Sequence, residues 1–168
     1  IMADPKKIKG VQKINSLRKK YKTNKASDVL IPAEEMLWLP CDMIALNHQS
    51  GGGIPFGKIV ELFGEESSGK SLLAQSFARA AQALGGQVLW ADSEYSFTHN
   101  WAQLNNIDLD KVELFKEKSI ETISDWSVDM AYYYRSLHPN NEPILMVVDS
   151  LAALDCKANE GLEQSDRK

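Results

Sequence analysis

The octapeptide from Gly64 to Ser71 holds the residues of this chain that are best suited to chemistry. It fits the pattern G-x-x-x-x-G-K-[ST]. In that pattern the glycines let backbone N–H groups turn toward a phosphate, and the N-terminus of the following helix adds partial positive charge. Lys70 would reach the terminal phosphates, and the Ser71 hydroxyl would bind Mg²⁺. A chance turn is the alternative, but an apolar run precedes the octapeptide and an amphipathic one follows it. The sequence therefore predicts a nucleoside triphosphate site made of Gly64, Glu65, Glu66, Ser67, Ser68, Gly69, Lys70 and Ser71.

Acidic residues follow two of the apolar runs downstream. Asp149 comes directly after Ile144–Val148, where an acid can help to hold Mg²⁺ beside a phosphate loop, or can be a simple turn residue. Asp92 and Glu94 follow a second run. One of these two acids could orient the water that attacks the γ-phosphate. Spacing alone leaves an alternative open, in which both acids belong to a solvated turn that caps the next helix.

Trp101 lies seven residues after Glu94. Its indole could stack on an adenine, although a tryptophan in an amphipathic helix more commonly packs in a core. The other aromatic side chains, Trp38, Trp126 and the run Tyr132–Tyr134, are most simply explained by packing in the core or on the surface.

The residues around these positions predict alternating strands and helices. Continuous apolar runs are typical of parallel strands that are buried on both faces, and helices between them imply a parallel sheet. Gly85-Gly86 is a suitable end for the first helix, and a short helix over Cys41–Leu46 is possible before the core. The predicted elements are strand Lys58–Phe63, helix Lys70–Leu84, strand Gln87–Ala91, helix Phe97–Asn105, strand Leu114–Phe115, helix Ile120–Leu137 and strand Pro143–Val148.

The composition is that of a globular domain. The chain has 168 residues, of which 43% are hydrophobic and 25% charged, so it can bury a substantial core. No run approaches the roughly 20 apolar residues of a membrane span, and the N-terminus lacks the apolar segment of a signal peptide. We therefore expect no membrane association and a cytoplasmic location. Cys41 and Cys156 are far apart, as is typical of two reduced thiols.

Basic residues are concentrated at the N-terminus. Residues 1–25 contain nine Lys and Arg and one acid, whereas the remaining residues carry ten basic and 22 acidic side chains, a net charge of −12. Within the basic segment an apolar stripe recurs at helical spacing, through Ile8, Val11, Ile14, Leu17 and Tyr21. The stripe could pack on its own domain or on a second subunit, or the basic face could contact DNA. We expect two parts, residues 1–28 with this helix and a linker, and residues 29–168 with the catalytic core.

Several motifs together resemble the RecA recombinase family. The run from Gly51 to Ser71 resembles the start of that family's ATPase core, and Leu39–Leu46 is similar to the segment before it. Asp92-Ser93-Glu94 and Val147–Leu154 look like the next two signatures, in the same order. The resemblance covers about residues 6–168, and the departures in sequence are closer to a phage-encoded member than to a bacterial one.

The resemblance implies roles for individual residues. Lys70 and Ser71 match the phosphate-binding lysine and the Mg²⁺-binding hydroxyl, and Glu94 matches the catalytic glutamate that activates water. Asp149 matches the acid of the Mg²⁺ shell. Trp101 aligns with an aromatic residue that stacks on adenine, usually a tyrosine in the family. The implied cofactors are ATP and Mg²⁺, and residues 8–21 match the helix that packs on the neighbouring protomer of a helical filament.

The function that the resemblance implies is that of a DNA-dependent ATPase. Such a protein forms filaments on single-stranded DNA and promotes strand exchange. A RecA core continues well beyond Lys168, through the loops that bind DNA, so we expect a truncated core whose DNA contacts lie mostly outside this chain. Two alternatives are a non-catalytic piece that binds nucleotide or a complementary chain, and a hexameric helicase or clock-type ATPase of the same superfamily.

Overall fold

A computed structural model of the chain describes residues 14–26, 36–137, 140 and 142–156. The chain divides into two compact units, residues 1–36 and residues 37–168. In the first unit residues 14–21 are helical, as the apolar stripe predicts, and Ile14, Leu17 and Tyr21 are all exposed. Residues 8–13 and the predicted boundary near residue 28 fall outside the described residues, so those parts of the prediction remain predictions.

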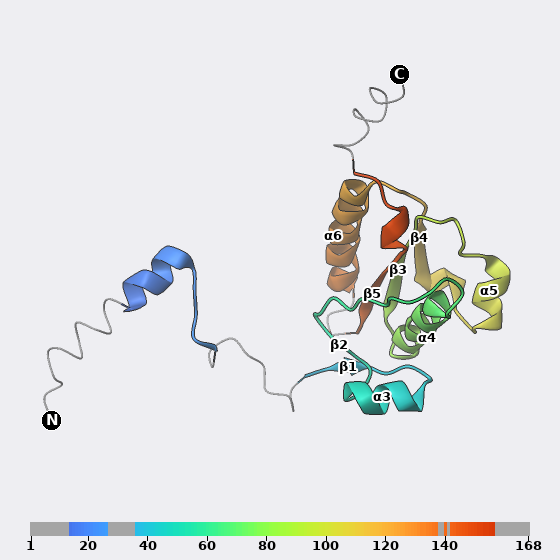
Figure 1. The fold of residues 1–168 in the computed structure, drawn as a ribbon, viewed down its shortest axis with the longest axis horizontal. Coiled ribbons are helices and arrows are strands. Elements are labelled where there is room, and N and C mark those ends of the chain that lie inside the picture. The colour runs from blue at the N-terminus through green and yellow to red at the C-terminus, as the bar shows by residue number, and fades with distance from the viewer. Residues whose placement is uncertain (1–13, 27–35, 138–139, 141, 157–168) are drawn as a thin grey trace, which may run out of the picture. The chain divides into compact units, whose positions relative to one another are not determined.

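The second unit alternates strands and helices, which confirms the α/β prediction (Figure 1). In chain order its elements are β1 (Trp38–Leu39), α3 (Ile44–Ser50), β2 (Ile54–Pro55), α4 (Lys70–Ala83), β3 (Gln87–Asp92), α5 (His99–Leu104), the 3-10 turn η2 (Leu109–Lys111), β4 (Val112–Phe115), α6 (Ile120–Leu137), β5 (Ile144–Asp149) and the 3-10 turn η3 (Leu151–Ala153).

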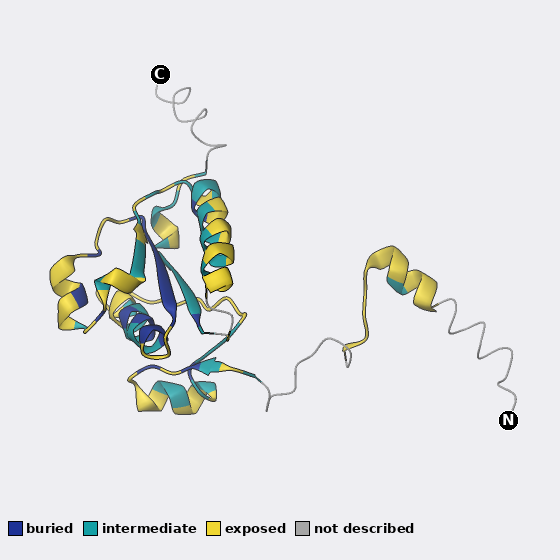
Figure 2. Ribbon diagram, turned by 180° about the vertical axis from the view of Figure 1, so that it is seen from behind, coloured by how far each residue is buried: buried dark blue, intermediate teal, exposed yellow. Residues whose placement is uncertain are grey.

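The main sheet has three parallel strands in the order β4-β3-β5. The register pairs Trp90 of the central strand with Leu114 on one side and with Val147 on the other. Figures 1 and 2 show the strands between helices α4 and α6. All six residues of β3 are buried, because this strand has a neighbour on each edge and a helix on each face.

Side chains along each strand point alternately to the two faces of the sheet, and this determines which of them contact α4 and which contact α6. Val88 and Trp90 lie in one buried cluster with Phe77, Ala78 and Ala81 of α4, and Val112 packs against it. The neighbouring positions of β4 face the other helix, since Phe115 packs on Trp126 and Glu113 accepts a hydrogen bond from Tyr134 of α6. Figure 2 shows the resulting line of buried residues along β3 and one side of α4.

The glycine pair ends α4 as predicted. Gly85 has a φ of 79°, and the N–H of Gly86 donates to the carbonyl of Ala81, which satisfies a carbonyl in the last turn of the helix. The N–H of Gln87 then donates to the carbonyl of Pro143 and starts the β3–β5 pairing. A side chain at Gly86 would lie 2.2 Å from the Pro143 carbonyl oxygen, so glycine is required at this crossing.

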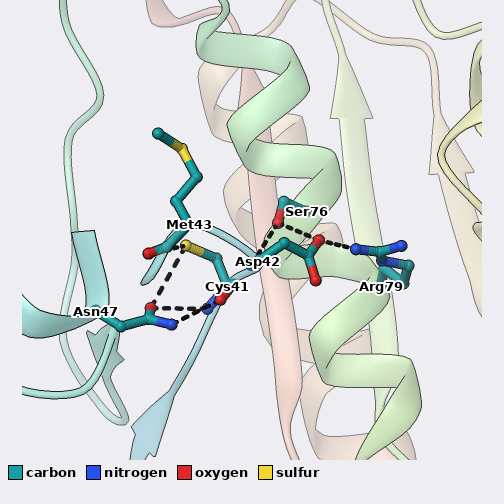
Figure 3. A network of polar contacts seen from close by, with 6 residues as sticks. All are labelled: Cys41, Asp42, Met43, Asn47, Ser76 and Arg79. Carbon is teal, nitrogen blue, oxygen red and sulfur yellow. Dashed lines mark hydrogen bonds and ion pairs between the residues drawn. The ribbon is translucent and has the colours of Figure 1, made fainter. Parts of the chain in front are cut away.

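A small antiparallel pair, β1 with β2, brackets α3 and is joined to α4 by polar contacts (Figure 3). Asp42 accepts hydrogen bonds from Ser76 and Arg79 of α4, and its own N–H donates to Ser76. Asn47 bonds to both the N–H and the carbonyl of Cys41, which closes the turn before α3. The predicted short helix therefore exists, but it runs over Ile44–Ser50 rather than Cys41–Leu46.

The prediction of a strand over Lys58–Phe63 is wrong for this structure. Residues 58–64 have no regular secondary structure, and Phe63 keeps 87% of its surface exposed. A strand exists only where a neighbour pairs with its backbone, and no described residue supplies one for this segment. Strand β5 also lacks a second neighbour within the described part of the chain: it pairs there with β3 alone, and all six of its residues are half-buried.

The remaining differences from the prediction are shifts of element ends. Helix α5 begins at His99 rather than Phe97, because Phe97 turns into the core and contacts Trp90. Strand β4 is longer than predicted, and Asp149 is the last residue of β5 rather than the first residue after it. Within the described residues, no helix is both long enough and apolar enough to cross a membrane.

Candidate functional site

The loop of the predicted phosphate site is folded around its own lysine. Lys70 Nζ donates to the carbonyl oxygens of Gly64 at 3.1 Å and Glu65 at 2.8 Å. Ser67 and Gly69 have φ angles of 60° and 91°, so the backbone turns sharply before α4 begins at Lys70. A left-handed φ is cheap for glycine, which explains why the second glycine of the pattern stands immediately before the helix. The loop is exposed and thus open to a ligand.

The length of α4 places this loop at the carboxyl edge of the sheet. The helix has 14 residues and the strand that follows it has six, so each is about 20 Å long. Because the chain reverses at Gly85-Gly86 and α4 packs along β3, the N-terminus of the helix reaches the level where β3 ends. The carboxyl edge of a parallel sheet is where open α/β folds bind ligands.

The two acids after β3 have different surroundings. Asp92 is fully buried, and its two carboxylate oxygens accept hydrogen bonds from the N–H groups of Ser96 and Phe97, each at 3.0 Å. It therefore closes the loop between β3 and α5. Glu94 is exposed at the tip of that loop. Of the two acids that spacing left open, only Glu94 has a carboxylate that can face a ligand.

Serines connect the ends of β3 and β5. The Ser93 N–H donates to the Asp149 carbonyl at 2.9 Å, and the Ser93 hydroxyl donates to the Ser150 carbonyl at 2.8 Å. The Ser150 hydroxyl donates to Oε1 of Glu94. These bonds bring Glu94 and Asp149 to the same corner of the sheet. Ser93 had no role predicted from the sequence, and the family resemblance matched Ser150 only to the serine that follows the Mg²⁺-shell acid; the signal for a role was the acid-serine pair at the end of each of these two strands.

Asp149 has an oxygen that suits a hydrated metal ion. Its Oδ2 atom is buried and has no hydrogen-bond partner among the described residues. A buried carboxylate oxygen without a partner is costly, and a water of a Mg²⁺ shell would satisfy it. No group of three His, Cys, Asp or Glu that could hold a metal occurs in the described part of the chain. Mg²⁺ is commonly held by one or two side chains together with water and phosphates, and Ser71 and Asp149 are the residues that could contribute here.

Trp101 is not a core residue, which excludes the alternative that the sequence left open. It lies on α5, and 53% of its surface is exposed. The helix is fixed to α4, because Asn105 donates from its side chain to the Gln75 side chain at 2.7 Å and to the Trp101 carbonyl at 2.8 Å. The indole therefore stands on a fixed helix that starts beside the carboxyl edge of the sheet, where a planar base could reach it.

Comparisons with known proteins point to one family. The family model of the RecA N-terminal domain matches residues 19–168. Protein RecA of Roseiflexus castenholzii is 34% identical over 117 residues, which cover 69% of this chain and 31% of that protein. Protein RecA of Streptomyces avermitilis is 34% identical over 136 residues, which cover 80% of this chain and 34% of that protein. The chain thus spans about a third of the length of these curated relatives.

Proposed function

The chain belongs to the RecA family, and we propose that it carries the ATP-binding part of a recombination protein. The whole protein would form filaments on single-stranded DNA, promote strand exchange and hydrolyse ATP in a DNA-dependent way. One observation supports this proposal most directly: the phosphate loop and two acidic residues lie at the same edge of the sheet. The phosphate loop starts α4 at the same sheet edge where Asp149 ends β5 and where Glu94 lies in the loop that follows the adjacent parallel strand β3.

Each side chain has a task that its surroundings allow. Lys70 would exchange its two loop carbonyls for the terminal phosphates of ATP, since an ammonium group prefers a phosphate to a neutral oxygen. Ser71 and, through water, Asp149 would hold Mg²⁺, which offsets charge on the phosphates. Glu94 would orient the attacking water and accept its proton. The exposed face of Trp101 would stack on the adenine.

The exposed stripe of the N-terminal helix supports self-association. Ile14, Leu17 and Tyr21 lie on a short helix that is stable only when such a stripe is packed. The basic residues around the stripe and the acidic charge of the rest of the chain are complementary between two copies. We propose that residues 8–21 bind a neighbouring copy in a filament rather than DNA. This arrangement favours a filament over a ring-forming helicase.

The nucleotide site is tested by measuring the equilibrium binding of ATP and Mg²⁺ to the purified chain. A fluorescent ATP analogue reports the binding. The native chain should bind, and Lys70→Ala should weaken binding by at least about 100-fold, because a charge-assisted contact to phosphate is lost. Lys111→Ala is the matched control, since Lys111 is an exposed lysine of η2 with a weak contact to Asp108 at 3.9 Å. Equal affinity of Lys70→Ala and Lys111→Ala would contradict the proposed site.

The exposed edge of the sheet favours a second candidate function, association with a complementary chain. Strand β5 has one unpaired edge among the described residues. In the segment before the phosphate loop, Ile59 and Phe63 are exposed to solvent. An unpaired strand edge is a template for another strand, and exposed apolar side chains favour association. Size-exclusion chromatography with and without a chain that carries the rest of a RecA core would test this. Co-elution at a 1:1 ratio is expected, and separate elution at micromolar concentrations would exclude it.

A further inference from the structure

We propose that Ser150 is a positioning residue whose hydroxyl holds the carboxylate of Glu94, and that Ser93 holds Ser150 in place. The inference rests on the proposed function, in which Glu94 acts on the attacking water. It assigns to two serines the task of fixing that carboxylate relative to Asp149.

Three hydrogen bonds between the loop that follows β3 and the end of β5 form this arrangement. Ser93 is fully buried and uses both its N–H and its hydroxyl, on the Asp149 carbonyl and the Ser150 carbonyl. The backbone of Ser150 is therefore fixed to the end of β3. Its hydroxyl then reaches back across the same gap to Glu94 Oε1.

The hydroxyl of Ser150 is in an unusual position for a serine at the start of a helical turn. Ser150 is the N-cap residue of η3, where a serine side chain normally accepts a hydrogen bond from a backbone N–H of the turn. It makes no such bond here. The Ser150 side chain points toward the Glu94 carboxylate instead of capping η3. Capping of η3 therefore does not explain its orientation.

Glu94 needs such a partner. It is exposed in the loop that follows β3, so packing does not hold its side chain in one position. A free glutamate side chain loses substantial rotamer entropy when it is held in one position. A water-activating carboxylate must nevertheless stay within hydrogen-bond reach of the water. The bond from Ser150 engages Oε1, and Oε2 has no protein partner among the described residues, so it can face the water.

The first test measures the position of Glu94 without turnover. The native chain is labelled with ¹³C-glutamate, and the Glu94 carboxyl resonance is assigned with Glu94→Gln. Ser150→Ala should shift this resonance, whereas Ser150→Thr, which keeps a hydroxyl, should leave it near its native position. Ser136→Ala is the control, because the Ser136 hydroxyl donates within α6 to the Tyr133 carbonyl. A Glu94 resonance that is the same in Ser150→Ala and in the native chain would overturn the proposal.

The second test separates positioning from binding. With protein in excess over radiolabelled ATP and Mg²⁺, Ser150→Ala should bind ATP within about twofold of the native affinity. It should hydrolyse bound ATP about 100-fold more slowly, which is the cost of a small misplacement of a reacting group. Ser150→Thr should restore most of the rate. A native rate in Ser150→Ala would overturn the proposal.

The two tests distinguish this proposal from the proposed function. If the native chain fails to bind ATP, the proposed nucleotide site fails; if it binds ATP without hydrolysing it, the comparison of rates is made with the whole protein. The carboxyl resonance still decides whether Ser150 holds Glu94. If the native chain hydrolyses ATP and Ser150→Ala does so equally well, the proposed function stands and the positioning role is excluded.

Discussion

Two carboxylates that stand two residues apart have separate tasks, and the difference lies in their hydrogen bonds. Asp92 is buried and uses both oxygens on backbone N–H groups, so it holds the loop that presents Glu94. Glu94 is exposed, and its carboxylate accepts a hydrogen bond from Ser150. Asp92 therefore stabilises the loop, whereas in the proposed function Glu94 of the same loop acts on the attacking water.

Substitution of each acid by its amide should separate these tasks. Asp92→Asn leaves one acceptor oxygen for two N–H donors inside the protein, so it should lower the free energy of unfolding by about 1–3 kcal/mol. Glu94→Gln should change that free energy by less than about 0.5 kcal/mol, because it lies on the surface. Urea unfolding measures both. A larger loss of stability in Glu94→Gln than in Asp92→Asn would contradict the assignment.

Tyr134 links stability to high pH. Burial and the hydrogen bond that it donates to Glu113, at 2.5 Å, raise the pKa of this phenol to about 12. A folded-state pKa above the unfolded value of about 10 means that the contribution to stability is complete below about pH 10 and is lost as the pH rises toward 12. The free energy of unfolding should therefore fall more steeply between these pH values in the native chain than in Tyr134→Phe. Tyr132→Phe, at an exposed position, should behave like the native chain, and equal slopes in all three would refute the linkage.

The sequence predicted those residues whose role follows from their spacing along the chain. It did not predict those whose role depends on the direction in which the side chain points. The pattern Gly64–Ser71 placed a loop at the start of a helix, and the structure has that loop. The choice between Asp92 and Glu94 depends on which carboxylate the backbone turns inward. The exposure of Trp101 likewise depends on the rotation of α5, which is fixed by a contact between Asn105 and Gln75. Residue spacing shows neither orientation, and only the family resemblance selected Glu94 over Asp92 and a stacking role for Trp101.

At the scale of elements, hydrophobic patterns predicted the three strands of the main sheet and the helices that pack on it, but not the two-residue strands β1 and β2. Strand β3 is buried on both faces because β4, β5, α4 and α6 are all present around it. The apolar segment before the phosphate loop has the same strand-like composition but no pairing partner among the described residues. The amino-acid composition of a segment indicates its tendency to form a strand, but a strand forms only when a second strand pairs with its backbone.

The turn between α3 and β2 allows a matched test at this scale. Gly53 has a φ of 119°, and an added Cβ would lie 2.0 Å from the Leu39 carbonyl oxygen. Gly57 also has a positive φ, 68°, but an added Cβ would meet nothing within 4 Å. Gly57→Ala should cost about 1 kcal/mol of unfolding free energy from backbone strain alone. Gly53→Ala should cost about 3 kcal/mol or more, because the β1–β2 pair must also separate. Equal losses, measured by urea unfolding, would show that the close contact is unimportant.

At the scale of the whole molecule, the chain consists of an acidic α/β unit and a basic helical segment with an exposed stripe. We expect self-association through that stripe. Leu17→Glu should lower the weight-average sedimentation coefficient of the concentrated chain, because it places a charge in the apolar contact. Asn15→Glu adds the same charge at another exposed position of the helix and should sediment like the native chain. Identical sedimentation of both variants would contradict the proposed role of residues 8–21.

The most direct test of the nucleotide site is a crystal structure of the chain with Mg²⁺ and a slowly hydrolysed ATP analogue. We expect the phosphates at the N-terminus of α4 with Lys70 on the terminal phosphates and Ser71 on the metal. A metal-bound water should lie within hydrogen-bond distance of Asp149 Oδ2, the buried oxygen that has no partner among the described residues. Nucleotide bound away from the loop Gly64–Ser71, or Mg²⁺ without any link to Asp149, would contradict the account.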